Sequence, residues 1–221
     1  MTRLLWDQTG SREYETGVDH GVLYPMNAVG AYPAGVPWNG LAAVTESPSG
    51  AEPSPVYADN IKYLNLVSAE EFGCTIEAYT YPEEFAECDG SKQAALTGAF
   101  LGQQPRKQFG LVYRTLKGND VLGQEYGYKL HLIYGALASP SEKGYQTVND
   151  TPEAISFSWE VSTTPVAVTG FKPTAYLVVD SNAANPAGLA LLEDELFGDA
   201  TVGVANLPLP DAVIALLTVG G

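Results

Sequence analysis

The chain has 221 residues, of which 45% are hydrophobic, so it can bury a sizeable core in one large domain. Its formal net charge is −15, from 26 acidic and 11 basic residues. This charge balance excludes a protein that binds nucleic acid through its phosphates, because such binding needs many lysines and arginines. The sequence contains no run of about eighteen apolar residues, which excludes a membrane-spanning helix.

The acidic residues are concentrated in two parts of the chain. Residues 1–90 contain 14 acidic and 3 basic side chains, residues 91–180 contain 7 and 8, and residues 181–221 contain 5 and 0. An acidic surface keeps a protein soluble, and it also lets nucleic acid pass without sticking. The charge alone does not separate these two roles. The N-terminal sequence lacks an apolar stretch before a cleavage site, so we expect no secretory signal peptide.

The first predicted elements flank an unusual segment. Strand-like apolar stretches begin at Trp38 and at Val56. Between them, the sequence ESPSGAEPSP (residues 46–55) has three prolines, one glycine, two glutamates and no basic residue. This composition predicts a stiff, acidic and exposed loop. A slack surface loop, a ligand clamp and an arm that docks onto another copy of the chain all fit these residues.

Two further elements are expected before residue 90. Ser68 and Glu71 have the spacing of a capping box, which predicts a short turn of helix. Residues 74–81 alternate as a strand, although the alternation slips at Ala78–Tyr79.

Residues 107–134 predict a β-hairpin. Two alternating runs are separated by KGNDVLGQE, which supplies two glycines and an Asn-Asp pair for the turn. One face of the second run carries five apolar or aromatic residues: Tyr126, Tyr128, Leu130, Leu132 and Tyr134. His131 falls on the other face, which favours an exposed or cross-strand histidine over a catalytic base.

The C-terminal half ends in strands followed by helices. Residues 155–162 alternate strictly as a half-buried strand, and residues 174–181 are more uniformly apolar, which predicts a strand covered on both faces. A helix is expected from Asn185 to Gly198, and a second short one after Pro210.

This order of elements predicts an all-β fold with minor helix, a sandwich or barrel with short helices. We expect residues 1–180 to form the β domain, with an N-terminal arm, and residues 181–221 to form a helical extension packed on the same domain.

Signals for catalysis are weak. His20 and His131 are the only histidines, and no metal-binding or nucleophile motif accompanies them. Residues 81–90 hold four acidic side chains, which fits a solvated turn better than the paired carboxylates of a glycosidase or a calcium loop. Cys74 and Cys88 are expected to be reduced core residues. We therefore expect no enzyme, no cofactor and no metal, although exposed aromatic residues leave a carbohydrate-binding or receptor-binding β module as an alternative.

Four blocks of sequence carry a resemblance to a known family. They are YETGVDHGVLYP, GVPWNGLAAVTESPSGAE, YADNIKYLNL and TIEAYTYPEEFAECDG. Together they resemble the major tail protein, or tail tube protein, of long-tailed bacteriophages, of the non-contractile kind. The resemblance runs through most of residues 14–90 and continues more weakly to about residue 180.

The resemblance implies a structural virion protein, made in the host cytoplasm, with no catalytic residues. It implies a β-sandwich subunit whose sheets join those of its neighbours in hexameric rings. The rings stack into the tube through which phage DNA is ejected. The implied partners are other copies of the chain, a tape measure protein, and tail terminator and initiator proteins, with no membrane.

The resemblance also assigns residues. A long loop that contacts the next ring falls on ten residues: Glu46, Ser47, Pro48, Ser49, Gly50, Ala51, Glu52, Pro53, Ser54 and Pro55. DNA would pass through the lumen without specific binding, and four acids in or beside predicted strands and turns are candidates to face it: Asp59, Glu77, Asp120 and Glu125. We expect the acidic loop to dock on a less acidic surface supplied by residues 91–180.

Overall fold

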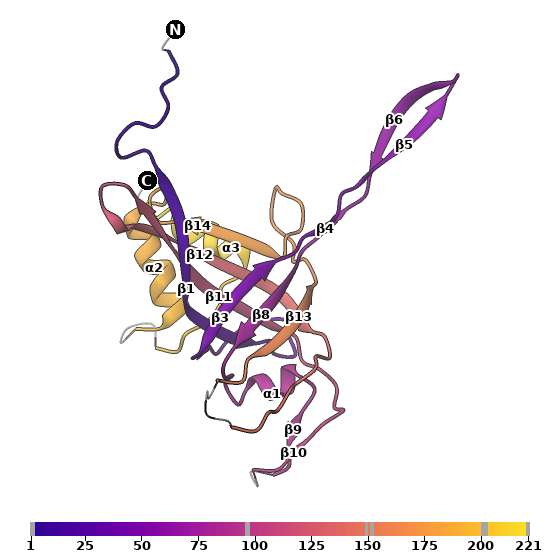
Figure 1. The fold of residues 1–221 in the computed structure, drawn as a ribbon, viewed down its shortest axis with the longest axis vertical. Coiled ribbons are helices and arrows are strands. Elements are labelled where there is room, and N and C mark those ends of the chain that lie inside the picture. The colour runs from indigo at the N-terminus through magenta and orange to yellow at the C-terminus, as the bar shows by residue number, and fades with distance from the viewer. Residues whose placement is uncertain (1–2, 96–97, 149, 151–152, 200–202, 220–221) are drawn as a thin grey trace.

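One eight-stranded antiparallel sheet organises the protein (Figure 1). The computed structural model describes residues 3–95, 98–148, 150, 153–199 and 203–219. The strand order is β2-β1-β11-β12-β13-β8-β3, and β14 pairs with β12 beside β13. The eight strands are β1 (Glu13–Pro25), β2 (Val36–Pro37), β3 (Leu41–Glu46), β8 (Gly73–Ala78), β11 (Phe109–Asn119), β12 (Gly123–Ala138), β13 (Phe157–Thr163) and β14 (Tyr176–Asp180). The prediction of an all-β fold with minor helix is confirmed.

In the part of the chain that the structure describes, three short two-stranded ribbons and three helices complete the fold. The ribbons pair β4 (Ser49–Gly50) with β7 (Glu70–Glu71), β5 (Pro53–Ala58) with β6 (Ile61–Val67), and β9 (Lys92–Gln93) with β10 (Phe100–Leu101). The helices are α1 (Phe85–Cys88), α2 (Pro186–Phe197) and α3 (Pro210–Leu217). Among the described residues, no helix combines the length and apolar character needed to cross a membrane.

The central strands separate two apolar cores because their side chains alternate between the faces of the sheet. On β12, Ile133 packs into a first core with Trp159 of β13 and Phe85 of α1. Leu132 packs into a second core with Leu192 of α2. The sheet curls around the first core so that β1 and β3, which are not hydrogen-bonded neighbours, come into contact.

The strongest sequence patterns correspond to real elements. The expected hairpin over residues 107–134 is formed by β11 and β12, and the alternation over 155–162 becomes β13. The expected strand over 174–181 becomes β14, but its burial is uneven. Val179 is 4% exposed and Val178 is 40% exposed, so one face of this strand is only partly covered.

The two C-terminal helices form as predicted. The side chain of Asn185 caps α2 by accepting hydrogen bonds from the N–H groups of Ala187 and Gly188, and Gly198 ends the helix. Leu192 of α2 and Val213 of α3 share the second core with strand residues from the first 180 positions.

The helical turn expected at Ser68–Glu71 is wrong. Glu70 and Glu71 form β7, which pairs with Ser49 and Gly50 of β4. A partner strand twenty residues earlier in the chain supplies the backbone hydrogen bonds that the capping box would otherwise satisfy locally.

Candidate functional site

A two-stranded arm, defined here as residues 47–72, projects from the body of the protein (Figure 1). β4 and β7 form its lower part, and β5 and β6 form its outer part. The chain reverses at Asp59 and Asn60, which have φ angles of 50° and 61°. Aspartate and asparagine tolerate this left-handed conformation, which two-residue hairpin turns require.

The expected loop over residues 46–55 is not a loop in the structure. Glu46 ends β3, β4 follows, and Pro53 begins β5, so these residues make up one limb of the arm. The prolines argue against a strand in the sequence, because proline has no N–H group to donate to a neighbouring strand. They are tolerated here because each strand of an isolated ribbon has a free edge towards solvent.

The arm exposes large apolar side chains along its whole outer part. Tyr57 and Tyr63 are 68% and 67% exposed, and five further residues are exposed as well: Val56, Ile61, Leu64, Leu66 and Val67. Scattered exposed apolar residues are ordinary, but a continuous set on a projecting element marks an interaction surface.

The pairing register sorts these residues onto the two faces of the ribbon. Leu64 lies opposite Val56, and Lys62 lies opposite Tyr57 after a register shift. The shift leaves Tyr63 of β6 without an opposite residue, so the alternation is continuous along β5 only. Pro53 and Pro55 therefore share a face with Tyr57, and Val67 lies opposite Pro53 on that face. We call this side, made of Pro53, Pro55, Tyr57, Lys62 and Val67, the lysine face of the arm. Lys62 is the one basic residue in the sequence of the arm.

Both limbs of the arm are anchored to the same part of the sheet. Next to the first limb, Glu46 at the end of β3 accepts hydrogen bonds from the hydroxyl groups of Tyr113, at 2.7 Å, and of Tyr176. On the other limb, the ring of Phe72 stacks on Tyr176 with centroids 4.5 Å apart. The hydroxyl of Thr163 donates to the Phe72 carbonyl at 2.6 Å. These contacts fix the direction in which the arm leaves the body.

His131 supports this anchor from within the sheet. Its Nδ1 lies 2.6 Å from the Tyr176 hydroxyl and its Nε2 lies 2.8 Å from the Thr115 hydroxyl. Every donor and acceptor is satisfied when a neutral imidazole donates from Nδ1 to Tyr176, which in turn donates to Glu46. The histidine is only 7% exposed, so it is a buried cross-strand residue and not a surface one.

Burial lowers the pKa of His131, and Lys129 lowers it further. Glu46 and Glu15 act in the opposite direction but do not outweigh burial. The neutral imidazole is therefore the form that the folded protein favours.

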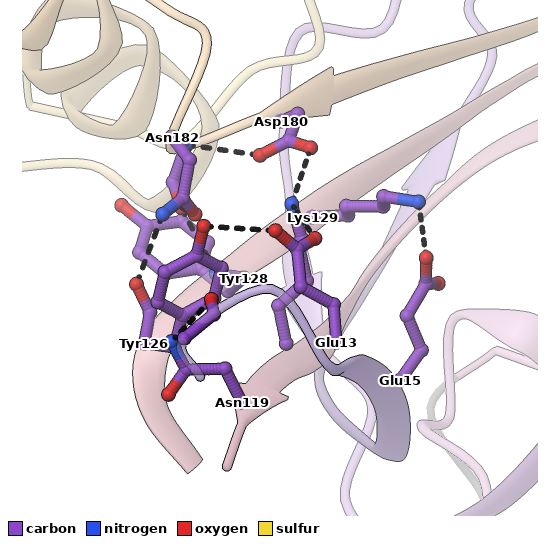
Figure 2. Close-up of polar contacts among 11 residues, drawn as sticks. Glu13, Glu15, Asn119, Tyr126, Tyr128, Lys129, Asp180 and Asn182 are labelled. Atoms are coloured by element: carbon purple, nitrogen blue, oxygen red, sulfur yellow. Dashed lines mark hydrogen bonds and ion pairs between the residues drawn. The ribbon is translucent and has the colours of Figure 1, made fainter. Parts of the chain in front are cut away.

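The N-terminal part of the chain leaves the body at a cluster of ion pairs (Figure 2). Glu13 accepts a hydrogen bond from Tyr126 at 2.9 Å and lies 3.5 Å from the ammonium of Lys117. The same ammonium donates to Asp180 at 2.8 Å, and Lys129 pairs with Glu15. These contacts join β1, β11, β12 and β14, so they fix the start of β1. Before it, Leu4, Leu5 and Trp6 are each about 70% exposed.

The expectation that residues 91–180 supply a less acidic docking surface needs revision. Six of the eight basic side chains in this range form ion pairs with the chain's own acids: Arg106, Lys107, Arg114, Lys117, Lys129 and Lys143. Their charge is largely neutralised within the subunit. They are therefore poorly suited to attract the acidic residues of an arm.

The four acids expected to face a lumen are not brought together. Asp59 lies at the tip of the arm, and Glu77 lies on β8. Asp120 lies in the turn between β11 and β12, and Glu125 lies near the start of β12. Asp120 has a structural contact there, because its carboxylate accepts the N–H of Gly10 at 2.9 Å and so holds the N-terminal segment.

Glu77 belongs to a polar face of the sheet that the sequence analysis did not predict. Glu77 lies opposite Ser158, and Glu160 lies opposite Thr75, while Trp159 and Ile76 point to the first core. Thr45 of β3 extends this face through its pairing with Thr75. We define the polar sheet face as the outward side of β3, β8 and β13; in those strands it carries two glutamates, small residues and hydroxyl groups. Glu160 lay on the polar side of a predicted strand, but only strand pairing could place it near Glu77.

The stretch expected to be a solvated acidic turn forms α1 and its flanks. Asp89 pairs with Arg106 at 3.3 Å and with Lys143, and Glu87 pairs with Lys107 at 3.3 Å. Across the described part of the chain, no three His, Cys, Asp or Glu side chains gather as a metal site.

Cys74 and Cys88 are buried and unpaired. Burial raises the pKa of each thiol to about 12, so neither is a nucleophile.

Comparison with known proteins does not assign a family or a function to the chain. No protein-family model matches the sequence, and no curated protein matches it.

Proposed function

We propose that this protein is a self-assembling structural subunit that forms hexameric rings stacked into the tail tube of a non-contractile phage. The observation that carries the proposal is the projecting arm with its exposed apolar side chains. The four blocks of sequence that resemble tail tube proteins support it.

The arm requires a partner for physical reasons. An isolated two-stranded hairpin is marginally stable in water, and this one extends away from its own body (Figure 1). Exposed apolar residues lie on both of its faces. Its backbone edges are unpaired within the described chain. A partner that covers the arm buries these side chains and orders the ribbon at the same time.

Another copy of the chain is the partner that gives a tube. A contact between an arm on one copy and a different surface on the next is heterologous, and heterologous contacts generate rings or open stacks. Every added copy then presents a fresh arm. Tape measure, terminator and initiator proteins would set the length and the ends of such a stack.

The polar sheet face suits the wall of a DNA conduit. Glu77 and Glu160 place negative charge on it, and the outward positions of β3, β8 and β13 hold no lysine or arginine. Carboxylates repel the phosphate backbone, so DNA would slide past without binding.

Electron microscopy of the purified protein tests the proposal. We expect rings or tubes in negative stain. A variant in which two glycines replace residues 48–71 should keep its folded body but form no tubes, because the N–H of Ser47 already bonds to the carbonyl of Gly73 at 2.8 Å and a short linker can close the gap.

A wild-type protein that stays monomeric or trimeric at high concentration and binds glycans on an array would overturn the proposal. That result would favour the carbohydrate-binding or receptor-binding module, for which the exposed Tyr57 and Tyr63 would provide stacking surfaces.

A further inference from the structure

The arm and a cleft beside α1 lie at opposite ends of the protein. The arm joins the sheet where β3 ends, at Glu46, and where β8 begins, at Gly73. The other end of β8, at Ala78, leads into α1 and the β9–β10 ribbon. Figure 1 shows the arm rising from the upper part of the body and α1, β9 and β10 at the bottom. Copies stacked in one orientation along this axis bring the arm of one towards the cleft of the next.

The cleft has a volume of about 520 Å³ and a mixed lining. Phe100, which is 47% exposed, contributes an apolar wall. Three acids also line it, and Lys107 pairs with one of them, Glu87. The other two, Glu83 and Glu84, are exposed and take part in no ion pair among the described residues.

Lys92 also lines the cleft and is exposed. Its positive charge balances only one of the two unpaired glutamates, so the open part of the cleft has a net negative charge. A docked segment should therefore bring apolar side chains and a positive charge.

The lysine face of the arm has this chemistry. Tyr57 and Val67 supply exposed apolar surface, and Lys62 lies opposite Tyr57 on the same side. The other side of the ribbon, with Ile61 and Leu64, has no cation. Charge and apolar surface thus match the cleft on one face of the arm only.

We propose that the lysine face of the arm docks into the cleft of the next copy, with Lys62 against Glu83 and Glu84 and the apolar side chains against Phe100. This inference rests on the proposed function, because it names the surface that receives the arm within the stack. The contact is end to end and heterologous, so it repeats at every layer.

A charge exchange tests the pairing. The critical concentration for assembly, measured by sedimentation, should rise about fivefold or more for Lys62→Glu, and similarly for the double variant Glu83→Lys with Glu84→Lys. Combining all three changes should bring it back towards the wild-type value, because the attraction is restored with reversed sign.

The matched control is Lys172→Glu, which alters an exposed lysine in a different groove, at the base of the arm. It should leave the critical concentration unchanged. If Lys172→Glu impairs assembly and the charge exchange restores nothing, the cleft is not the acceptor.

A cross-link provides a second measurement that does not depend on assembly energetics. Tyr57→Cys with Glu84→Cys should give disulfide-linked ladders when assembled protein is oxidised, and neither single variant should do so. The native Cys74 and Cys88 are buried and will not compete.

The outcomes separate the two proposals. Tubes without ladders, and without rescue by the charge exchange, overturn the docking site but keep the tube subunit. A wild-type chain that never assembles overturns both.

Discussion

Removing apolar surface from the arm should weaken assembly without unfolding the subunit. Ile61 and Leu66 are 63% and 59% exposed. Burying a whole side chain of this kind stabilises by about 1.5–3 kcal/mol, so covering the exposed share contributes about 1–2 kcal/mol for each. The double variant Ile61→Ser with Leu66→Ser should therefore lose roughly 2–4 kcal/mol for each subunit added.

Because about 1.4 kcal/mol changes an equilibrium constant tenfold, the critical concentration should rise by between one and three orders of magnitude. Sedimentation of assembled material, with electron microscopy of the pellet, measures it. The melting temperature of the body should not change, since neither residue belongs to a core. Asn65→Ser, an exposed polar change in the same strand, is the matched control. An unchanged critical concentration in the double variant would refute the assignment of the arm as an assembly element.

Three further predictions concern other parts of the molecule. Since the folded state holds the pKa of His131 below its usual 6.5, its stabilising effect is complete above that pH and is lost as the pH falls towards the folded pKa. The free energy of unfolding should fall with acidification in this window, and less steeply in His131→Gln, as denaturant titrations can measure. Glu77→Lys with Glu160→Lys should make assembled protein retard duplex DNA in a gel at low salt, where the wild type does not. Cys74 and Cys88 should react with a thiol reagent at pH 8 only on unfolding, because burial raises their pKa values.

Controls make these predictions specific. Glu125→Lys adds the same kind of charge near the start of β12, away from the polar sheet face, and should not produce DNA retardation. Equal pH slopes in wild type and His131→Gln would contradict the role given to the buried imidazole. Rapid thiol labelling of folded protein would contradict the burial of the cysteines.

The elements that sequence predicted well are those determined by local chemistry. The β11–β12 hairpin follows from strict alternation on both sides of a turn, and α2 follows from the Asn185 cap and the Gly198 stop. These signals act within a few residues, so no tertiary contact is needed to interpret them.

The sequence does not predict the arm, because the residues whose pairing forms it are far apart in the chain. Pro53 and Pro55 oppose a strand prediction, and the pairing of Gly50 with Glu70 depends on chain that returns after the tip. A Cβ on Gly50 would lie 2.4 Å from the Ala69 carbonyl oxygen, so the two limbs need glycine at this crossing. The sequence shows the glycine but not the neighbour that requires it.

The candidate site was predicted only in part for the same reason. The composition of residues 46–55 marks them as unusual, whereas the apolar stretch that begins at Val56 is predicted only as a strand. Strand periodicity does not distinguish a buried face from a projecting ribbon. His131 is buried through contacts with Glu46 and Tyr176, both far from it in sequence.

The unpaired ribbon of the arm also has a kinetic consequence. Ordering it in a free subunit brings little stabilisation, since the partner that would bury its side chains is missing. Two free subunits that meet must order their arms for one contact, whereas a subunit that meets a finished end finds a surface already in place. Nucleation should therefore be slow and elongation fast, with a lag phase that short preformed seeds abolish. Such a subunit can accumulate in solution and still polymerise promptly when a template appears.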